Sequence, residues 1–114
     1  MSPFLQAWAT DLQITGATVL AMVFGAAIGW DRERADKPAG IRTHALVAGS
    51  ASLLVSLGAL LPAELAPALA PAGLRSDPLR VMEAVITGVS FLGAGTIIRG
   101  RGQRVEGLTT AAAM

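Results

Sequence analysis

Residues 12–30 read LQITGATVLAMVFGAAIGW, and this run of nineteen residues between Asp11 and Asp31 contains no charged side chain. An α-helix rises about 1.5 Å per residue, so the run predicts a helix of roughly 28 Å, close to the ~30 Å hydrocarbon core of a bilayer. We therefore expect a transmembrane helix here. We do not expect a cleaved signal peptide, because such a peptide begins with a basic region and the first basic residue is Arg32.

Two further runs have the same character. Residues 43–61 carry no Asp, Glu, Lys or Arg, and residues 81–98 carry a single charge, Glu83. The sequence therefore predicts an all-α, polytopic membrane protein with three full transmembrane helices at about residues 12–30, 43–61 and 81–98.

The composition agrees with a membrane protein and excludes several other classes. Hydrophobic residues make up 53% of the 114 residues and charged residues 15%, whereas soluble domains carry about 25% charge. The net charge of +1 gives no basic footprint for nucleic acid. The sequence has no cysteine and one histidine, which excludes disulfides, thiolate metal sites and multi-histidine metal sites.

Lys and Arg counts in the connecting segments predict the orientation in the membrane. The N-terminal segment has none, the segment 31–42 has four, the segment 62–80 has two, and the residues after 98 have three. Because short cytoplasmic loops are enriched in Lys and Arg, we expect a periplasmic N-terminus in a bacterial inner membrane. Trp8 and Trp30 lie 22 residues apart, roughly 33 Å along a helix, as expected for residues at the two interfaces.

The remaining segments complete the predicted organisation. Four prolines between residues 62 and 80 argue against one long helix there. The final residues 107–114, GLTTAAAM, resemble the start of a fourth helix at about residue 106. Since eight residues are too few to cross a bilayer, we expect residues 1–114 to be a single transmembrane domain whose natural chain continues further.

Each predicted helix has a narrow face of small residues that allows close helix packing. Gly25 and Gly29 form such a pair in the first helix, and small residues recur in the second and third at helical spacing. An alternative interpretation is a polar path between the second and third helices, lined by Glu83, Thr87, Ser90, Ser52 and Ser56. Glu83 is the ionisable group inside a predicted span, but it also lies one turn from Arg80 and is placed to pair with it or to reach lipid headgroups.

The first loop carries the densest charge. Between residues 31 and 42 three carboxylates lie among four basic residues. Hard cations such as magnesium need one or two carboxylates, yet the local sum of +1 disfavours a dedicated metal site, so we predict no bound cofactor. We expect these carboxylates to pair with Arg99, Arg101 and Arg104 on the same membrane side, or the basic residues to contact anionic lipid headgroups. Thr43 is the expected cap of the second helix. No catalytic constellation is present, which predicts that the protein is not an enzyme.

Several motifs resemble the MgtC/SapB family. Residues 32–44, with Arg32-Glu-Arg34, Lys37-Pro-Ala-Gly40 and Arg42-Thr-His44, are similar to the first cytoplasmic loop of that family. Residues 77–80, 88–99 and 105–111 are similar to its third helix and the start of its fourth. The resemblance covers roughly residues 12–114 and implies a bacterial inner-membrane protein of four or five helices, some members having a cytoplasmic C-terminal domain.

The resemblance also implies a role in magnesium transport or magnesium homeostasis. The MgtC branch acts in adaptation to low magnesium and in survival in macrophages, and it is linked to restraint of the ATP synthase. That branch commonly has Asn where this chain has Thr109 and Gln where it has Glu83. This sequence therefore looks more like the SapB branch. Three hypotheses follow: action through anionic lipid or a membrane-protein partner, ion transport in a homo-oligomer, or a passive scaffold. The expected working surface of the first hypothesis consists of Arg32, Glu33, Arg34, Lys37, Arg42, His44 and Arg99.

Overall fold

The computed structural model describes residues 3–69, 71, 77–99 and 105–114. Its elements follow in the order α1 (Pro3–Arg34), α2 (Ile41–Leu69), α3 (Pro78–Thr96), β1 (Ile98–Arg99), β2 (Val105–Glu106) and α4 (Leu108–Ala112). The protein is all-α apart from the two-residue strands, which confirms the predicted class.

Three helices are long and apolar enough to cross a membrane: Phe4–Arg34 with 31 residues, Ile41–Pro62 with 22, and Pro78–Thr96 with 19. The helices α1 and α2 extend beyond the runs predicted from the sequence. The reason is that the absence of charge marks the part of a helix that lies in hydrocarbon, whereas the hydrogen-bonded helix continues through Asp11 and the polar residues that follow Trp30.

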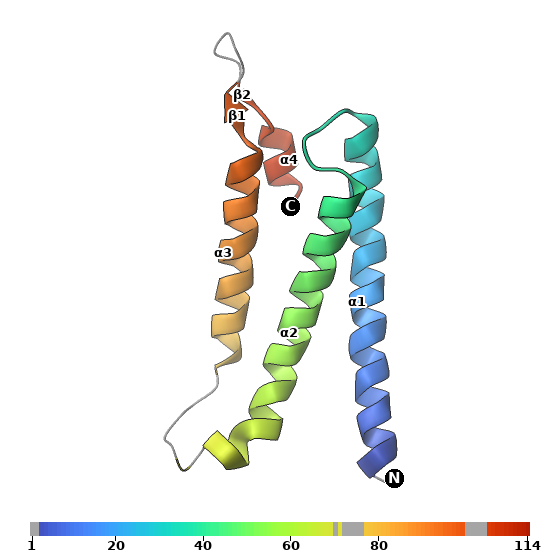
Figure 1. The fold of residues 1–114 in the computed structure, drawn as a ribbon, viewed down its shortest axis with the longest axis vertical. Helices are drawn as coiled ribbons and strands as arrows, with labels where there is room; N and C mark the ends of the chain where they lie inside the picture. The colour runs from blue at the N-terminus through green and yellow to red at the C-terminus, as the bar shows by residue number, and fades with distance from the viewer. Residues whose placement is uncertain (1–2, 70, 72–76, 100–104) are drawn as a thin grey trace.

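The long helices lie in a single layer. The Cα atoms extend over 61 × 31 × 13 Å, and the shortest dimension is close to the width of one helix. Helix α2 runs diagonally across the layer, beside α1 at the end that carries the α1–α2 turn and beside α3 at the opposite end (Figure 1). We call the end with the α1–α2 turn the loop-1 end.

Glycines allow these helices to approach closely. A Cβ atom on Gly29 of α1 would lie 2.6 Å from both the Gly40 carbonyl oxygen and the Ile41 Cα, and one on Gly25 would overlap the His44 carbonyl. At the other end of α2, a Cβ on Gly58 would lie 3.0 Å from the side chain of Val81 in α3. The predicted small-residue pair of α1 therefore packs against the backbone of α2.

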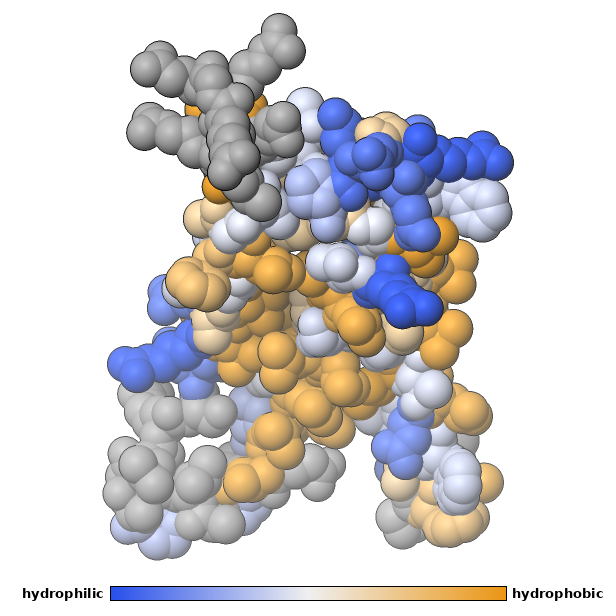
Figure 2. All heavy atoms as spheres, turned by 45° about the horizontal axis from the view of Figure 1, so that its top comes forward, coloured by the Kyte–Doolittle hydropathy of each residue, from blue (hydrophilic) through white to orange (hydrophobic). Residues whose placement is uncertain are grey.

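Apolar side chains are largely on the outside of the molecule. Among the described residues, the only buried hydrophobic side chain is that of Ala39, at 2% exposure. Large apolar side chains such as Phe91 are exposed. Figure 2 shows a broad hydrophobic band with hydrophilic side chains gathered above it at the loop-1 end. This distribution fits a protein surrounded by lipid, where apolar exposure carries no penalty.

The segment after residue 61 differs from the sequence expectation. Helix α2 continues through Pro62 and Pro67 to Leu69, beyond the transmembrane run predicted to end at about residue 61. Asp77 lies outside any helix, so one helix does not cover the whole segment 62–80. A proline removes one backbone hydrogen bond and bends a helix without always ending it, and α2 bends at this end in Figure 1. Helix α3 begins conventionally, because Oδ1 of Asp77 accepts a hydrogen bond from the Leu79 N–H at 3.0 Å.

A short hairpin joins α3 to α4. Strands β1 and β2 pair antiparallel, with Ile98 opposite Glu106. Gly107 then adopts a left-handed conformation with φ of 87°, and a Cβ there would overlap the Thr96 carbonyl, so this turn requires glycine. The turn directs α4 into the space between α3 and α2 (Figure 1), close to the predicted start of a fourth helix.

Candidate functional site

The α1–α2 turn is built around the carboxylate of Glu33. Its Oε2 atom accepts a hydrogen bond from the Ile41 N–H at 3.0 Å, so Glu33 caps α2 from eight residues upstream. The chain turns at Asp36, which has φ of 52°, a conformation that Asp tolerates better than most residues. Since α2 begins at Ile41, the prediction that Thr43 caps it is wrong; Thr43 lies inside the first turn.

Basic side chains surround an open cavity of about 590 Å³ at this turn. Lys37 and Arg42 line the cavity together with Glu33, Asp36 and the start of α2, and both basic residues are exposed. The Glu33 carboxylate is already engaged by Ile41. Among the described residues, the one ion pair is between the Arg32 guanidinium and the Asp31 carboxylate, 3.6 Å apart. Lys37 and Arg42 form no ion pair among the described residues, and they share the cavity with the two carboxylates of Glu33 and Asp36.

Arg32 and Arg34, two of the other three arginines predicted for this surface, have different surroundings. The guanidinium carbon of Arg34 lies 5.1 Å from the ring centroid of Trp30, a cation–π arrangement. Arg32 is half-buried and faces Asp31. Arg34 and Arg32 are thus held against α1, whereas Lys37 and Arg42 are the members that line the cavity.

The β hairpin lies at the same end of the molecule. A second cavity of about 410 Å³ is lined by Asp36, Lys37 and Pro38 on one side and by the segment from Val105 to Thr109 on the other. The first and third loops are therefore neighbours, as the sequence predicts. Arg99 belongs to β1. The expected pairing with Arg101 and Arg104 concerns residues outside the described ranges and stays a prediction.

His44 lies inside the bundle and apart from the exposed members of the predicted surface. It is 4% exposed, and its Nδ1 donates to the Gly40 carbonyl oxygen at 3.0 Å. The close approach of Gly25 to the His44 backbone explains this burial. The sequence placed His44 at the membrane interface; it did not indicate that α1 would cover it.

The residues of the predicted polar path are divided between different faces. Glu83 and Thr87 are exposed on α3. The Thr87 hydroxyl donates a hydrogen bond to the backbone carbonyl of Glu83 at 2.8 Å. The structure shows no ion pair between the side chains of the described residues Glu83 and Arg80. Ser90 lines a cavity of about 360 Å³ between the helices. Ser52 and Ser56 are half-buried on α2. The cavity of about 250 Å³ between α2 and α3 is lined instead by other residues, including Ser50, Ala84 and Gly88.

The loop-1 end offers basic side chains but, among the described residues, no cluster of metal-ligating side chains. Within the residues the structure describes, no three His, Cys, Asp or Glu side chains lie close enough to hold a metal ion. A phosphate or carboxylate group, by contrast, would find a lysine and an arginine beside one cavity. Besides the burial of His44, sequence reasoning missed the capping role of Glu33 and the complete burial of Thr110, at 0% exposure.

The three long apolar helices and the charged loop-1 end define a polytopic α-helical membrane protein. The profile described as the MgtC family matches residues 18–114. The chain belongs to the MgtC family.

Three relatives illustrate the similarity. The chain is 40% identical over 94 residues to the Escherichia coli protein named "Putative magnesium transporter YhiD", covering 82% of this chain and 42% of that protein. It is 36% identical over 112 residues to SapB of Bacillus subtilis, covering 95% and 45%, and 38% identical over 95 residues to MgtC of Salmonella typhimurium, covering 82% and 35%. The chain thus spans about two fifths of the length of these curated relatives. No solved structure matches it.

Proposed function

We propose that this chain forms the membrane-embedded part of a bacterial inner-membrane protein that acts in magnesium homeostasis or envelope stress and is not an enzyme. It works by binding anionic groups at the loop-1 end, from lipid headgroups or from a membrane-protein partner. The observation that carries the proposal is the cavity beside Lys37 and Arg42, whose charges form no ion pair with the carboxylates of the described residues. The magnesium role rests on the name of the Escherichia coli relative.

The charges at this end are held in place by the fold. Glu33 binds the first N–H of α2, which fixes the direction in which α2 leaves the turn. Lys37 and Arg42 flank that point on either side and share the cavity. A basic residue close to an anionic membrane surface contributes about 1 kcal/mol to its attraction, so the two together contribute about 2 kcal/mol, which corresponds to roughly a 30-fold change in affinity.

The experiment that tests this function compares two variants of the full-length protein in cells that lack the endogenous copy. Lys37→Gln combined with Arg42→Gln is expected to abolish growth support in low magnesium and to reduce the anionic lipid retained by the purified protein. Arg80→Gln, which removes an exposed charge at the opposite end, is the matched control. Equal activity of the double variant and the control, at equal membrane insertion, would exclude the loop-1 end as the working surface.

We also propose an orientation with the N-terminus in the periplasm and the loop-1 end in the cytoplasm. The Lys and Arg counts support it, and the first and third loops lie at one end of the molecule (Figure 1). Lys37 is the one lysine in this sequence, so a membrane-impermeant amine reagent followed by peptide mass analysis reports its side directly. We expect labelling of Lys37 in inverted vesicles and of the N-terminal amine in spheroplasts; the reverse pattern contradicts the orientation.

A second candidate function is ion transport. The name of the Escherichia coli relative supports it, as does the exposed Glu83 inside a candidate span. Because Glu83 and Thr87 lie outside the two cavities between the helices, transport would require another helix or a second copy to complete the path. Magnesium flux into liposomes containing the full-length protein, lost in Glu83→Gln, would favour transport over the loop-1 mechanism.

A further inference from the structure

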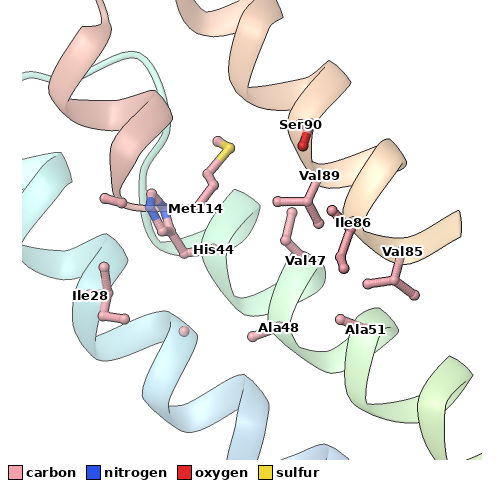
Figure 3. A pocket seen from close by; sticks show the side chains of 12 residues that line it. Ile28, His44, Val47, Ala48, Ala51, Val85, Ile86, Val89, Ser90 and Met114 are labelled. Atoms are coloured by element: carbon pink, nitrogen blue, oxygen red, sulfur yellow. The ribbon is translucent and has the colours of Figure 1, made fainter. Parts of the chain in front are cut away.

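The cavities of this structure differ in the chemistry of their linings. The cavity of about 360 Å³ between the long helices is lined mainly by aliphatic side chains, with His44 and Ser90 among its polar ones (Figure 3). The cavity of about 590 Å³ at the α1–α2 turn, which we call the loop-1 cavity, is lined by Glu33, Asp36, Lys37, Gly40, Ile41, Arg42 and Thr43. Its volume lies within the roughly 300–1,000 Å³ that is typical of small-molecule sites.

The loop-1 cavity carries charges of both signs that do not pair with each other. Lys37 and Arg42 supply two positive charges, and Glu33 and Asp36 supply two negative ones. None of these four residues takes part in an ion pair among the described residues. A ligand with one group of each sign is therefore complementary to this lining, whereas a purely anionic ligand would place negative charge beside Asp36, and juxtaposed like charges are unfavourable.

The positive side of the cavity suits a phosphate group. Backbone N–H groups in the first turn of an α-helix have no acceptor within the helix, and Ile41, Arg42 and Thr43 of α2 line the cavity. Glu33 accepts the N–H of Ile41, which leaves those of Arg42 and Thr43 as donors. Together with the side chains of Arg42 and Lys37, they are the kind of donors that bind phosphate in proteins.

The negative side of the cavity suits a primary ammonium group. Asp36 is exposed and its carboxylate forms no ion pair among the described residues. One oxygen of Glu33, Oε2, is engaged by the Ile41 N–H, so Asp36 is the freer of the two carboxylates. A primary ammonium donates up to three hydrogen bonds to such oxygens, whereas a trimethylammonium group has no N–H to donate.

The loop-1 cavity lies at the depth of lipid headgroups. The candidate spans Phe4–Arg34 and Ile41–Pro62 end and begin on either side of the turn, and hydrophilic side chains gather here above the hydrophobic band (Figure 2). Trp30, one turn before Arg34, is of a residue type enriched at membrane–water interfaces. A lipid headgroup is therefore a ligand that reaches the cavity directly from the bilayer.

We propose that the loop-1 cavity binds the headgroup of a phospholipid that carries both a phosphate and a primary ammonium, as phosphatidylethanolamine does. The phosphate contacts Lys37, Arg42 and the first turn of α2, and the ammonium contacts Asp36. This inference rests on the function proposed above, since it names the anionic group that the loop-1 end binds. It adds that a neighbouring positive group is recognised as well.

The test measures binding of single lipids to the purified full-length protein by native mass spectrometry. The probes are phosphatidylethanolamine, phosphatidylcholine and phosphatidylglycerol with identical acyl chains. The first two have the same net charge, so the ratio of their affinities reports recognition of the ammonium and not long-range attraction. We expect phosphatidylethanolamine to bind roughly two- to fivefold more tightly than phosphatidylcholine, as one exposed ion pair provides, and more tightly than phosphatidylglycerol.

Asp36→Asn is expected to remove the preference for phosphatidylethanolamine over phosphatidylcholine. Because Asn tolerates the left-handed conformation of residue 36, with φ of 52°, the turn should be retained. Asp31→Asn is the matched control. It removes the same charge from the same loop, at a residue that pairs with Arg32 and is not part of the cavity lining, and it should keep the preference.

The outcomes separate this inference from the proposed function. Equal affinities of the wild type for phosphatidylethanolamine and phosphatidylcholine overturn the inference, as does a preference that survives Asp36→Asn or is lost equally in Asp31→Asn. Tighter binding of phosphatidylglycerol, reduced by Lys37→Gln with Arg42→Gln, overturns the inference and leaves the proposed function standing. Unchanged binding of all three lipids in that double variant overturns both the inference and lipid binding at the loop-1 end. Displacement of the lipid by soluble phosphoethanolamine at equal concentration would assign the cavity to a free ligand and overturn the lipid assignment.

Discussion

A single methyl group on Gly29 tests how α1 and α2 are held together. In Gly29→Ala, the new Cβ would lie 2.6 Å from two backbone atoms of α2, the Gly40 oxygen and the Ile41 Cα, whereas ordinary contacts begin at 3.4 Å. The helices must therefore separate locally by about 0.8 Å, the difference between these distances. Because backbone atoms cannot rotate away as a side chain does, we expect the cost of an overpacked core, about 1–3 kcal/mol.

Gly16→Ala is the matched control on the same helix. A Cβ on Gly16 has nothing within 4 Å, and Ala is favoured over Gly in a helix by up to about 1 kcal/mol in water, so this variant is expected to be neutral or slightly stabilised. The measurement is reversible unfolding of the full-length protein in mixed micelles with increasing SDS. Equal free energies of unfolding for Gly29→Ala and Gly16→Ala would refute the packing of α1 on α2 described above.

Three further predictions concern the turns and the membrane boundary. Glu33→Ala removes the cap of α2 and should cost about 1 kcal/mol with faster amide exchange at Ile41, whereas Glu33→Gln keeps an acceptor oxygen and should exchange nearly as the wild type does. Gly107→Ala places a Cβ against the Thr96 carbonyl at a φ of 87° and should release α4, measured as increased amide exchange at Thr110; Gly95→Ala, which meets nothing within 4 Å, should have no such effect. In Trp8→Phe and Trp30→Phe, the fluorescence of the remaining tryptophan should be quenched more by lipids brominated near the headgroup than by lipids brominated deep in the chain.

The membrane spans could be predicted from the sequence because the bilayer fixes their length. A helix in lipid satisfies its own backbone and needs about 20 apolar residues, so a charge-free run such as residues 12–30 is sufficient to locate it. The shared face of Gly25 and Gly29 was equally predictable, since residues four apart lie on one side of a helix. Both conclusions depend only on local periodicity.

The relative rotation of the helices could not be predicted in the same way. Periodicity places Glu83 and Thr87 on one stripe of α3 and Ser52 and Ser56 on one stripe of α2, but it does not say which stripe faces a neighbour. In the structure Val85 and Val89 of α3 line the cavities against α2, while Glu83 and Thr87 are exposed.

Contacts that close a turn are also beyond local patterns. The hydrogen bond from Ile41 to Glu33 spans eight residues and depends on the left-handed conformation of Asp36. The burial of Thr110 depends in turn on Gly107, which directs α4 toward α2. Charge counts pointed to the basic residues of the first loop but did not separate Lys37 and Arg42, which line the cavity, from Arg34, which lies against Trp30.

The one-layer arrangement explains why the charged cavity lies where it does. Lipid replaces a hydrophobic core as the environment of the apolar side chains, so the helices are held by close backbone approach and by buried polar groups. Gly25, Gly29 and Gly49 make such contacts between α1 and α2 toward the loop-1 end, whereas Gly16, nearer the other end of α1, meets nothing. Helices α1 and α2 are therefore packed more closely toward the loop-1 end than near Gly16. Arg42 lies in the first turn of α2, and Lys37 lies in the turn that Glu33 joins to the start of α2. We expect a charged pair positioned in this way to bind an anionic group with less loss of entropy than the same pair on a free loop.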